Sequence, residues 1–248
     1  MSAINCIVES LVMLCESTMK RVQLNDERKI FMETVVIFDM DGVLIDSQPL
    51  HYEIDMTVLN ACGLQATIDM VVPYTGVSNP DRWPQYKEKM GLSESVERLI
   101  ELQEMFMREI FNASDLVAIE GIPELLQTLK HMSVPRGVAS SSSHELIQMV
   151  LERVGIKEYF DIIISGEDVK NGKPAPDIYL KAAKAFDLPP ENCIAIEDSP
   201  AGMLSAKNAG MICFAYRNPN TYGQVFTHAD YTIDKYSEVA NIIKGRLK

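Results

Sequence analysis

The chain has 248 residues, of which 47% are hydrophobic and 23% are charged, and this composition excludes a disordered, collagen-like or disulfide-dense protein. Its 23 Lys and Arg residues against 35 Asp and Glu residues give a formal net charge of −12. A chain this acidic lacks the basic surface that binds nucleic acid or an anionic membrane, so we expect neither partner. A local basic pocket for a small anion stays compatible with this charge.

The cysteine pattern indicates a reducing compartment. The number of cysteines is odd and no two form a C-x-x-C pair, so the pattern predicts neither a zinc site nor a disulfide framework. Reduced thiols are typical of a cytoplasmic protein, which is the location we expect. The five cysteines are Cys6, Cys15, Cys62, Cys193 and Cys213.

The first 33 residues do not match the rest of the chain. Residues 4–14 are apolar, but Glu9 interrupts them and no Lys or Arg precedes them, so they fit neither a signal peptide nor a membrane span. Two interpretations stay open for residues 1–33. They form an N-terminal extension with a short amphipathic helix, or they are a non-native start and Met32 is the natural beginning.

Six short apolar runs follow along the chain, separated by segments with helical spacing. The runs are continuous rather than alternating, as in parallel strands that are buried on both faces. Alternating strands and helices predict an α/β fold with a doubly wound parallel sheet. The predicted strands are Val35–Phe38, Gly137–Ala139, Ile162–Ile164, Ile194–Ile196, Met211–Phe214 and Tyr231–Ile233.

Nearly one hundred residues, 39–136, separate the first two predicted strands, far more than one crossover helix needs. Residues 48–116 have helical patterns, with prolines between them and no convincing strand. We therefore predict a small helical cap domain at 48–116, inserted into a catalytic core formed by 34–47 and 117–248. The cap is expected over the carboxyl end of the sheet, because the first strand leaves the sheet there.

Polar residues stand directly after four of the predicted strands. In open α/β sheets, ligands bind beyond the carboxyl ends of the strands, so these residues are expected to converge. Carboxylates crowded together repel one another unless a cation joins them, and Mg²⁺ prefers oxygen ligands. A lysine and a hydroxyl beside such an ion suit a phosphate group. The residues are Asp39, Asp41, Ser140, Lys173, Glu197 and Asp198.

Chemistry suggests a role for each of the first two acids. A carboxylate can attack phosphorus and form an aspartyl phosphate, and Asp39, at the strand end, is the rigid candidate for that nucleophile. Asp41 follows at a turn opened by Gly42, and it is predicted to act as the general acid and then the general base.

The remaining strand-end residues are predicted to hold the metal and the phosphate. Glu197 and Asp198 would bind Mg²⁺, which neutralises phosphoryl charge. Ser140 and Lys173 would bind the oxygens of the transferred group, and Ser141 is expected to line the same site.

These motifs resemble those of the haloacid dehalogenase superfamily. Asp39–Ser47 (DMDGVLIDS) resembles its first motif, Ser140 its second, Lys173 in GKPAPD its third, and Glu197–Gly202 (EDSPAG) its fourth. The resemblance covers about residues 34–247. The long insertion is similar to the helical cap of the phosphatase and β-phosphoglucomutase subfamily.

The resemblance implies specific roles. The first Asp of the family is the nucleophile and the second is the acid/base. Mg²⁺ contacts the Asp39 carboxylate, the backbone carbonyl of Asp41 and the Asp198 carboxylate, with Glu197 nearby. True dehalogenases lack the second Asp and need no metal, so Asp41 and the Glu197–Asp198 pair argue against that branch.

The resemblance also separates a phosphatase from a mutase. β-Phosphoglucomutases share His51, but their cap arginine is replaced here by Asn79, and no lysine stands near Leu102 where their cap lysine falls. A mutase must hold a bisphosphate by both phosphates, so the loss of these cations favours a phosphatase. Other cations of the insertion could take their place; these are Arg82, Lys87 and Arg98.

Four residues near the motifs have a structural interpretation instead. Asp46 and Ser47 are expected to cap the first cap helix, and Ser142 and Ser143 to cap the helix that begins near His144. His51 either forms a hydrogen bond between cap and core or contacts substrate.

The sequence therefore predicts a Mg²⁺-dependent phosphatase for a small phosphorylated metabolite of the sugar phosphate class, in a monomer or a weak dimer. The first alternative is an isomerase of the β-phosphoglucomutase type. The second is a non-catalytic interaction protein with the same fold.

Overall fold

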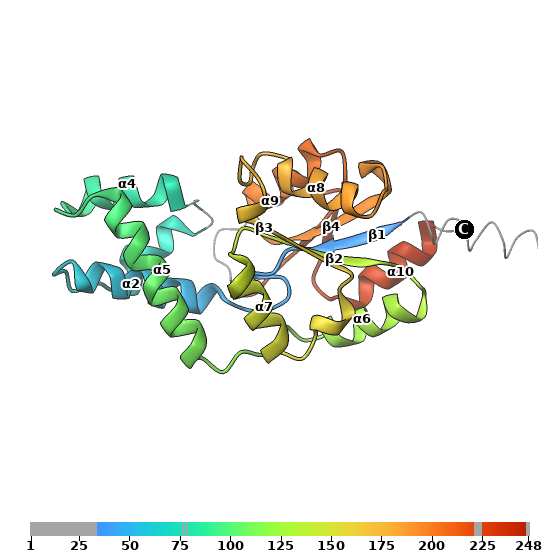
Figure 1. Ribbon diagram of the computed structural model, residues 1–248, viewed down its shortest axis with the longest axis horizontal. Coiled ribbons are helices and arrows are strands. Elements are labelled where there is room, and N and C mark those ends of the chain that lie inside the picture. The colour runs from blue at the N-terminus through green and yellow to red at the C-terminus, as the bar shows by residue number, and fades with distance from the viewer. Residues whose placement is uncertain (1–33, 76, 78, 221–224, 247–248) are drawn as a thin grey trace, which may run out of the picture.

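The computed structural model describes residues 34–75, 77, 79–220 and 225–246 (Figure 1). Within them, six parallel strands form one sheet in the order β3-β2-β1-β4-β5-β6. Each predicted apolar run becomes a strand of this sheet, so the predicted doubly wound fold is confirmed. The strands are β1 (Val35–Phe38), β2 (Arg136–Ser140), β3 (Ile162–Ser165), β4 (Cys193–Glu197), β5 (Ile212–Tyr216) and β6 (Tyr231–Ile233).

Helices cover both faces of the sheet (Figure 1). On one face, β1 packs against α6 (Ile122–His131), α7 (His144–Arg153) and α10 (Ser237–Arg246). On the other face lie α8 (Asp177–Ala185) and α9 (Pro200–Asn208). Short 3-10 turns complete the core at η2 (Lys157–Tyr159), η3 (Gly166–Asp168) and η4 (Pro190–Asn192).

Successive side chains of β1 point to opposite faces of the sheet. Val36 and Phe38 enter one hydrophobic cluster, whereas Val35 and Ile37 enter the other, because successive side chains of a strand point to opposite faces. All four residues are fully buried. This double burial is the reason that the strands read as continuous apolar runs.

The segment from Gln48 to Ala113, called the helical insertion below, contains a bundle of helices. It consists of α2 (Gln48–Ala61), α3 (Ile68–Val71), η1 (Val72–Tyr74), α4 (Asn79–Met90) and α5 (Val96–Ala113). These helices lie inside the predicted cap, residues 48–116, and Figure 1 places α2, α4 and α5 beyond the end of the sheet from which β1 leaves.

The helical insertion has a hydrophobic cluster of its own. Trp83 and Tyr86 are fully buried in it, and Val58 and Leu99 pack with them. Trp83 donates a hydrogen bond from Nε1 to Oε1 of Gln103 at 2.6 Å. The only tryptophan of the chain is therefore a packing residue of the insertion rather than a surface for substrate.

The predictions made for residues 1–33 fall outside the described residues. Among the helices that the structure does describe, none is both long enough and apolar enough to cross a membrane. Three cysteines in the described part, Cys62, Cys193 and Cys213, are free thiols, as the sequence predicts for them.

Candidate active site

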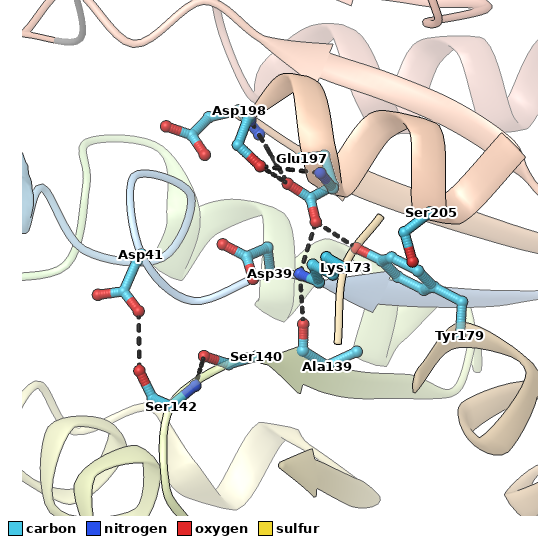
Figure 2. Close-up of polar contacts among 12 residues, drawn as sticks. Asp39, Asp41, Ala139, Ser140, Ser142, Lys173, Tyr179, Glu197, Asp198 and Ser205 are labelled. Carbon is cyan, nitrogen blue, oxygen red and sulfur yellow. Dashed lines mark hydrogen bonds and ion pairs between the residues drawn. The ribbon is translucent and has the colours of Figure 1, made fainter. Parts of the chain in front are cut away.

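The predicted strand-end residues meet at the carboxyl edge of the sheet (Figure 2). β1 pairs in register with both neighbours, so that Phe38 lies opposite Val138 of β2 and Ile196 of β4. Asp39 follows β1 directly, and its backbone N–H donates to the carbonyl of Ile196 at 2.9 Å. Ser140 and Glu197 are the last residues of β2 and β4, so the parallel register brings these side chains together.

Lys173 reaches this edge from the loop after β3. Its Nζ donates to Oδ1 of Asp39 at 2.7 Å, to Oε1 of Glu197 at 2.6 Å and to the carbonyl of Ala139 at 3.0 Å. Burial alone lowers the pKa of Lys173, but the adjacent Asp39 and Glu197 carboxylates outweigh it, and the pKa lies above its ordinary value. Lys173 is therefore a permanent cation beside the proposed nucleophile.

Glu197 is fully buried, and protein donors occupy its carboxylate. Oε1 accepts from Tyr179 Oη at 2.7 Å as well as from Lys173, and Oε2 accepts from Ser199 Oγ at 3.2 Å. Gly202 is required beside it, because a Cβ there would lie 2.0 Å from the carboxylate. The sequence predicts Glu197 as a metal ligand, whereas these contacts assign it first to holding Lys173.

Asp39, Glu197 and Asp198 form a buried acidic cluster, with a carboxylate oxygen of each within 4.8 Å of the others. Burial raises the pKa of Asp39 to about 8, although Lys173 opposes that rise. Burial, together with the neighbouring carboxylates, also raises the pKa of Asp198 well above its ordinary value. Three buried acids against one lysine leave excess negative charge, and their oxygen atoms fit a hard divalent cation such as Mg²⁺.

The turn after Asp39 depends on Gly42. Its φ of +76° lies in the left-handed region, which favours glycine. A Cβ at this position would also lie 2.1 Å from Oδ2 of Asp198. The glycine of the first motif thus allows the turn to pass close to an acid of the fourth motif.

Three side chains contact the carboxylate of Asp41. Oδ1 accepts from Ser47 Oγ at 2.7 Å and lies 3.3 Å from Nε2 of His51, and Oδ2 accepts from Ser142 Oγ at 3.1 Å. Burial raises the pKa of Asp41, but the contacts with His51, Ser47 and Ser142 outweigh it, so the pKa falls below its ordinary value. In this arrangement Asp41 is a carboxylate.

Two of these partners, Ser47 and Ser142, have other roles than the sequence predicts. Ser47 precedes α2 but its side chain makes no cap hydrogen bond there, and Ser142 likewise points to Asp41. The prediction that Ser47 and Ser142 cap helices is wrong, because both hydroxyls donate to the partly buried Asp41 carboxylate instead. Ser143 does cap α7, accepting from the N–H of Leu146 as predicted.

The loop after β2 is fixed from both sides. Ser140 is fully buried, and its Oγ accepts from the N–H of Ser142 at 3.1 Å. Ser165 donates from Oγ to the carbonyl of Ser142 at 2.7 Å. Ser141 is exposed, and its carbonyl lies so close to Gly166 that a Cβ there would be 2.6 Å away. Ser140 and Ser141 therefore lie on a rigid loop beside Asp39.

Asp46 is not a helix cap. It accepts from Nδ2 of Asn218 at 3.3 Å and also from Nδ2 of Asn220, both in the loop after β5. Asn218 is buried and also donates to the carbonyl of Gly42 at 3.2 Å, so it anchors the turn that carries Asp41. A lone asparagine about 170 residues away in the sequence offers no signal of this role.

One cap residue proposed from the sequence, Arg82, is placed differently. Arg82 is only 8% exposed, and its Nη2 lies 3.3 Å from Oδ1 of Asp55 inside the helical insertion. This placement argues against the predicted substrate contact. Asn79 begins α4, but its side chain lies outside the described part of the structure.

A doubly wound sheet with acids, a serine and a lysine at four strand ends defines a class of hydrolases, and known proteins bear this out. The haloacid dehalogenase-like hydrolase family matches residues 36–216. A phosphorylated carbohydrates phosphatase of Thermotoga maritima is 30% identical over 84% of this chain and 97% of its own length. Hexitol phosphatase B of Escherichia coli is 29% identical over 82% of this chain and 92% of its own.

A solved structure of this family has a similar fold. A β-phosphoglucomutase from Clostridium difficile is 25% identical, with a TM-score of 0.70, covering 86% of this chain and 96% of its own. The chain belongs to the haloacid dehalogenase-like hydrolases.

Proposed function

We propose that this protein is a Mg²⁺-dependent phosphatase that hydrolyses a small phosphomonoester, of the sugar phosphate class, through an aspartyl phosphate. The observation that carries the proposal is the contact of 2.7 Å between Lys173 and Asp39, with Asp41 two residues further along the same turn. A nucleophile, a phosphate-binding cation and an acid/base would thereby meet at one edge of the sheet. The names of the relatives support the substrate class.

The reaction has two steps. In the first, an oxygen of Asp39 forms a bond to phosphorus and the bond from phosphorus to the ester oxygen breaks. Asp41, a carboxylate in the present arrangement and protonated in the substrate complex, gives that oxygen its proton. In the second, water attacks the phosphorus, its proton passes to Asp41, and the Asp39 carboxylate leaves with the electron pair of its bond to phosphorus. Free phosphate and the original enzyme result.

The hydrogen bonds of the three acids indicate which of them would hold the metal. With Glu197 occupied by Lys173, Tyr179 and Ser199, the Asp39 and Asp198 carboxylates are the better candidates for ligands. The family resemblance adds the backbone carbonyl of Asp41. Mg²⁺ bound there supplies positive charge that neutralises the transferred phosphoryl group.

Asp41 must exchange one of its present partners, Ser47, for the leaving oxygen. Ser47 and His51 stand where the helical insertion begins, and Ser142 stands on the core. We propose that the helical insertion acts as a cap which closes over bound substrate and excludes water. Such a motion would shift Ser47 away from Asp41, while His51 keeps Asp41 in position for proton transfer.

The cations of the helical insertion favour a phosphatase over a mutase. A mutase needs a second phosphate grip, yet each of these cations already contacts a protein group. Nζ of Lys87, for example, donates to the carbonyls of Leu92 and Glu94 at 2.9 and 2.6 Å. The remaining contacts are Arg82 with Asp55, Lys89 with the ring of Tyr74, Arg98 with Glu101, and Arg108 with Glu145.

The test is phosphate release from glucose 6-phosphate, fructose 1-phosphate and sorbitol 6-phosphate with Mg²⁺. We expect turnover that stops with EDTA and is abolished in Asp39→Asn. Exposed Asp69 of α3 provides the control Asp69→Asn, which should keep wild-type turnover.

A parallel assay follows isomerisation of β-glucose 1-phosphate with a bisphosphate primer. Isomerisation with little phosphate released would favour the mutase. Neither reaction with any substrate would favour a non-catalytic interaction protein.

A further inference from the structure

The C-terminal end of α5 carries the chain back from the helical insertion to the core, and its last carbonyls need partners. The carbonyl of Ile110 accepts from the N–H and Oγ of Ser114 at 2.9 and 2.6 Å. The carbonyls of Phe111, Asn112 and Ser114 accept from one side chain, Arg153, which is the last residue of α7. One guanidinium therefore completes the end of this helix from a helix of the core.

Both terminal nitrogens of the Arg153 guanidinium donate hydrogen bonds. Nη1 donates to Phe111 O at 2.6 Å and to Asn112 O at 3.2 Å, and Nη2 donates to Ser114 O at 2.5 Å. A planar fork with several donors suits such a set of carbonyls better than a single ammonium group does. Its charge also interacts favourably with the negative end of the α5 dipole. Arg153 thus ties α5 to the core where the helical insertion ends.

A short series of contacts leads from this point to Asp41. Phe111 is fully buried, and its ring packs edge to face against the ring of His51, with centroids 5.9 Å apart and an interplanar angle of 61°. His51 in turn places Nε2 3.3 Å from Oδ1 of Asp41. The carbonyl that Arg153 binds most closely on Nη1 belongs to the same Phe111.

We infer that Arg153 is a positioning residue for Asp41. It fixes the end of α5, so that Phe111 holds His51 against Asp41. The inference rests on the proposed function, because it assigns Asp41 to proton transfer. Nothing in the sequence around Arg153 indicates this role, since the carbonyls lie about 40 residues earlier in the chain.

The test compares two esters of similar shape, p-nitrophenyl phosphate and phenyl phosphate. Nitrophenolate leaves without help, whereas phenolate is the stronger base and needs the proton from Asp41. General acid catalysis contributes about 10²- to 10⁴-fold, and partial loss of positioning should cost part of it. In Arg153→Met we expect the kcat ratio of phenyl to p-nitrophenyl phosphate to fall about tenfold, and in Arg153→Lys to fall to an intermediate value.

The control is Arg108→Met. Arg108 also reaches from α5 to α7, but it pairs only with exposed Glu145 at 3.9 Å and does not touch the α5 carbonyls. Its ratio should match the wild type. Hydrogen–deuterium exchange gives a second readout: the amide of Ser114 should exchange faster in Arg153→Met and at the wild-type rate in Arg108→Met.

The outcomes separate this inference from the proposed function. If the wild type hydrolyses both esters and Arg153→Met loses the two activities equally, or loses neither, Arg153 does not position Asp41. If the wild type releases phosphate from neither ester, the proposed function fails and the inference fails with it. Selective loss of phenyl phosphate turnover, with faster exchange at Ser114, supports the inference.

Discussion

Replacing Tyr179 by Phe tests the support of the buried Lys173–Glu197 pair. Tyr179 is fully buried in α8, and its Oη donates to Oε1 of Glu197 at 2.7 Å, the oxygen that also accepts from Lys173 at 2.6 Å. Burial and the Glu197 and Asp39 carboxylates raise the pKa of Tyr179 well above its ordinary value. The hydroxyl therefore stays protonated and donates throughout the pH range in which the protein is folded.

The magnitude follows from the charge of the acceptor. Phe keeps the ring and its packing, so the variant loses only the hydrogen bond to the carboxylate. Such a bond to a charged group contributes about 1.5–3 kcal/mol. We expect Tyr179→Phe to lower the free energy of unfolding by that amount, and to lower kcat because Lys173 and Asp39 lose part of their support.

Tyr236 provides a matched control. It is also buried, but its Oη donates to a neutral acceptor, the carbonyl of Val43, at 2.6 Å. Tyr236→Phe should therefore cost only about 0.5–1.5 kcal/mol. Urea unfolding followed by circular dichroism measures both variants under one condition. The reasoning is refuted if Tyr179→Phe loses no more stability than Tyr236→Phe does.

Three further predictions concern Asp41, the helical insertion and the metal. Ser47→Ala should cost about 1 kcal/mol at pH 7. Ser47 helps to keep the pKa of Asp41 below its ordinary value, so this stability is present above the unfolded pKa and is lost as the pH falls through the folded pKa. Urea unfolding over a descending pH series should show the difference between wild type and variant shrink, and a constant difference would contradict the prediction. Arg82→Met should lower the free energy of unfolding by about 3–5 kcal/mol, because it leaves buried Asp55 without its ion pair, and KM should stay unchanged. A raised KM at wild-type stability would instead support the substrate contact predicted from the sequence. Mg²⁺ at about 100 times its Kd should stabilise the fold by about 2.7 kcal/mol in thermal unfolding, and Asp198→Asn should remove that shift; an undiminished shift would place the ion elsewhere.

The sequence alone determined the sheet and the residues that stand at its carboxyl edge. A strand buried on both faces needs a continuous apolar run, so runs such as Val35–Phe38 and Ile194–Ile196 identify strands without any knowledge of contacts. Parallel strands all end at one edge, so a residue directly after each run has a predictable place. Asp39 and Glu197 could be brought together on that basis.

Only the tertiary structure decided which partners these residues have. Tyr179, Ser142 and Arg153 act through hydrogen bonds to groups that are distant in sequence. For Ser142 the sequence predicts a helix cap instead. Arg82 shows the converse, because a cation expected to meet substrate is buried against Asp55. The physical reason is that local sequence encodes backbone geometry and burial, whereas a side-chain hydrogen bond depends on which groups the packed elements bring within about 3 Å.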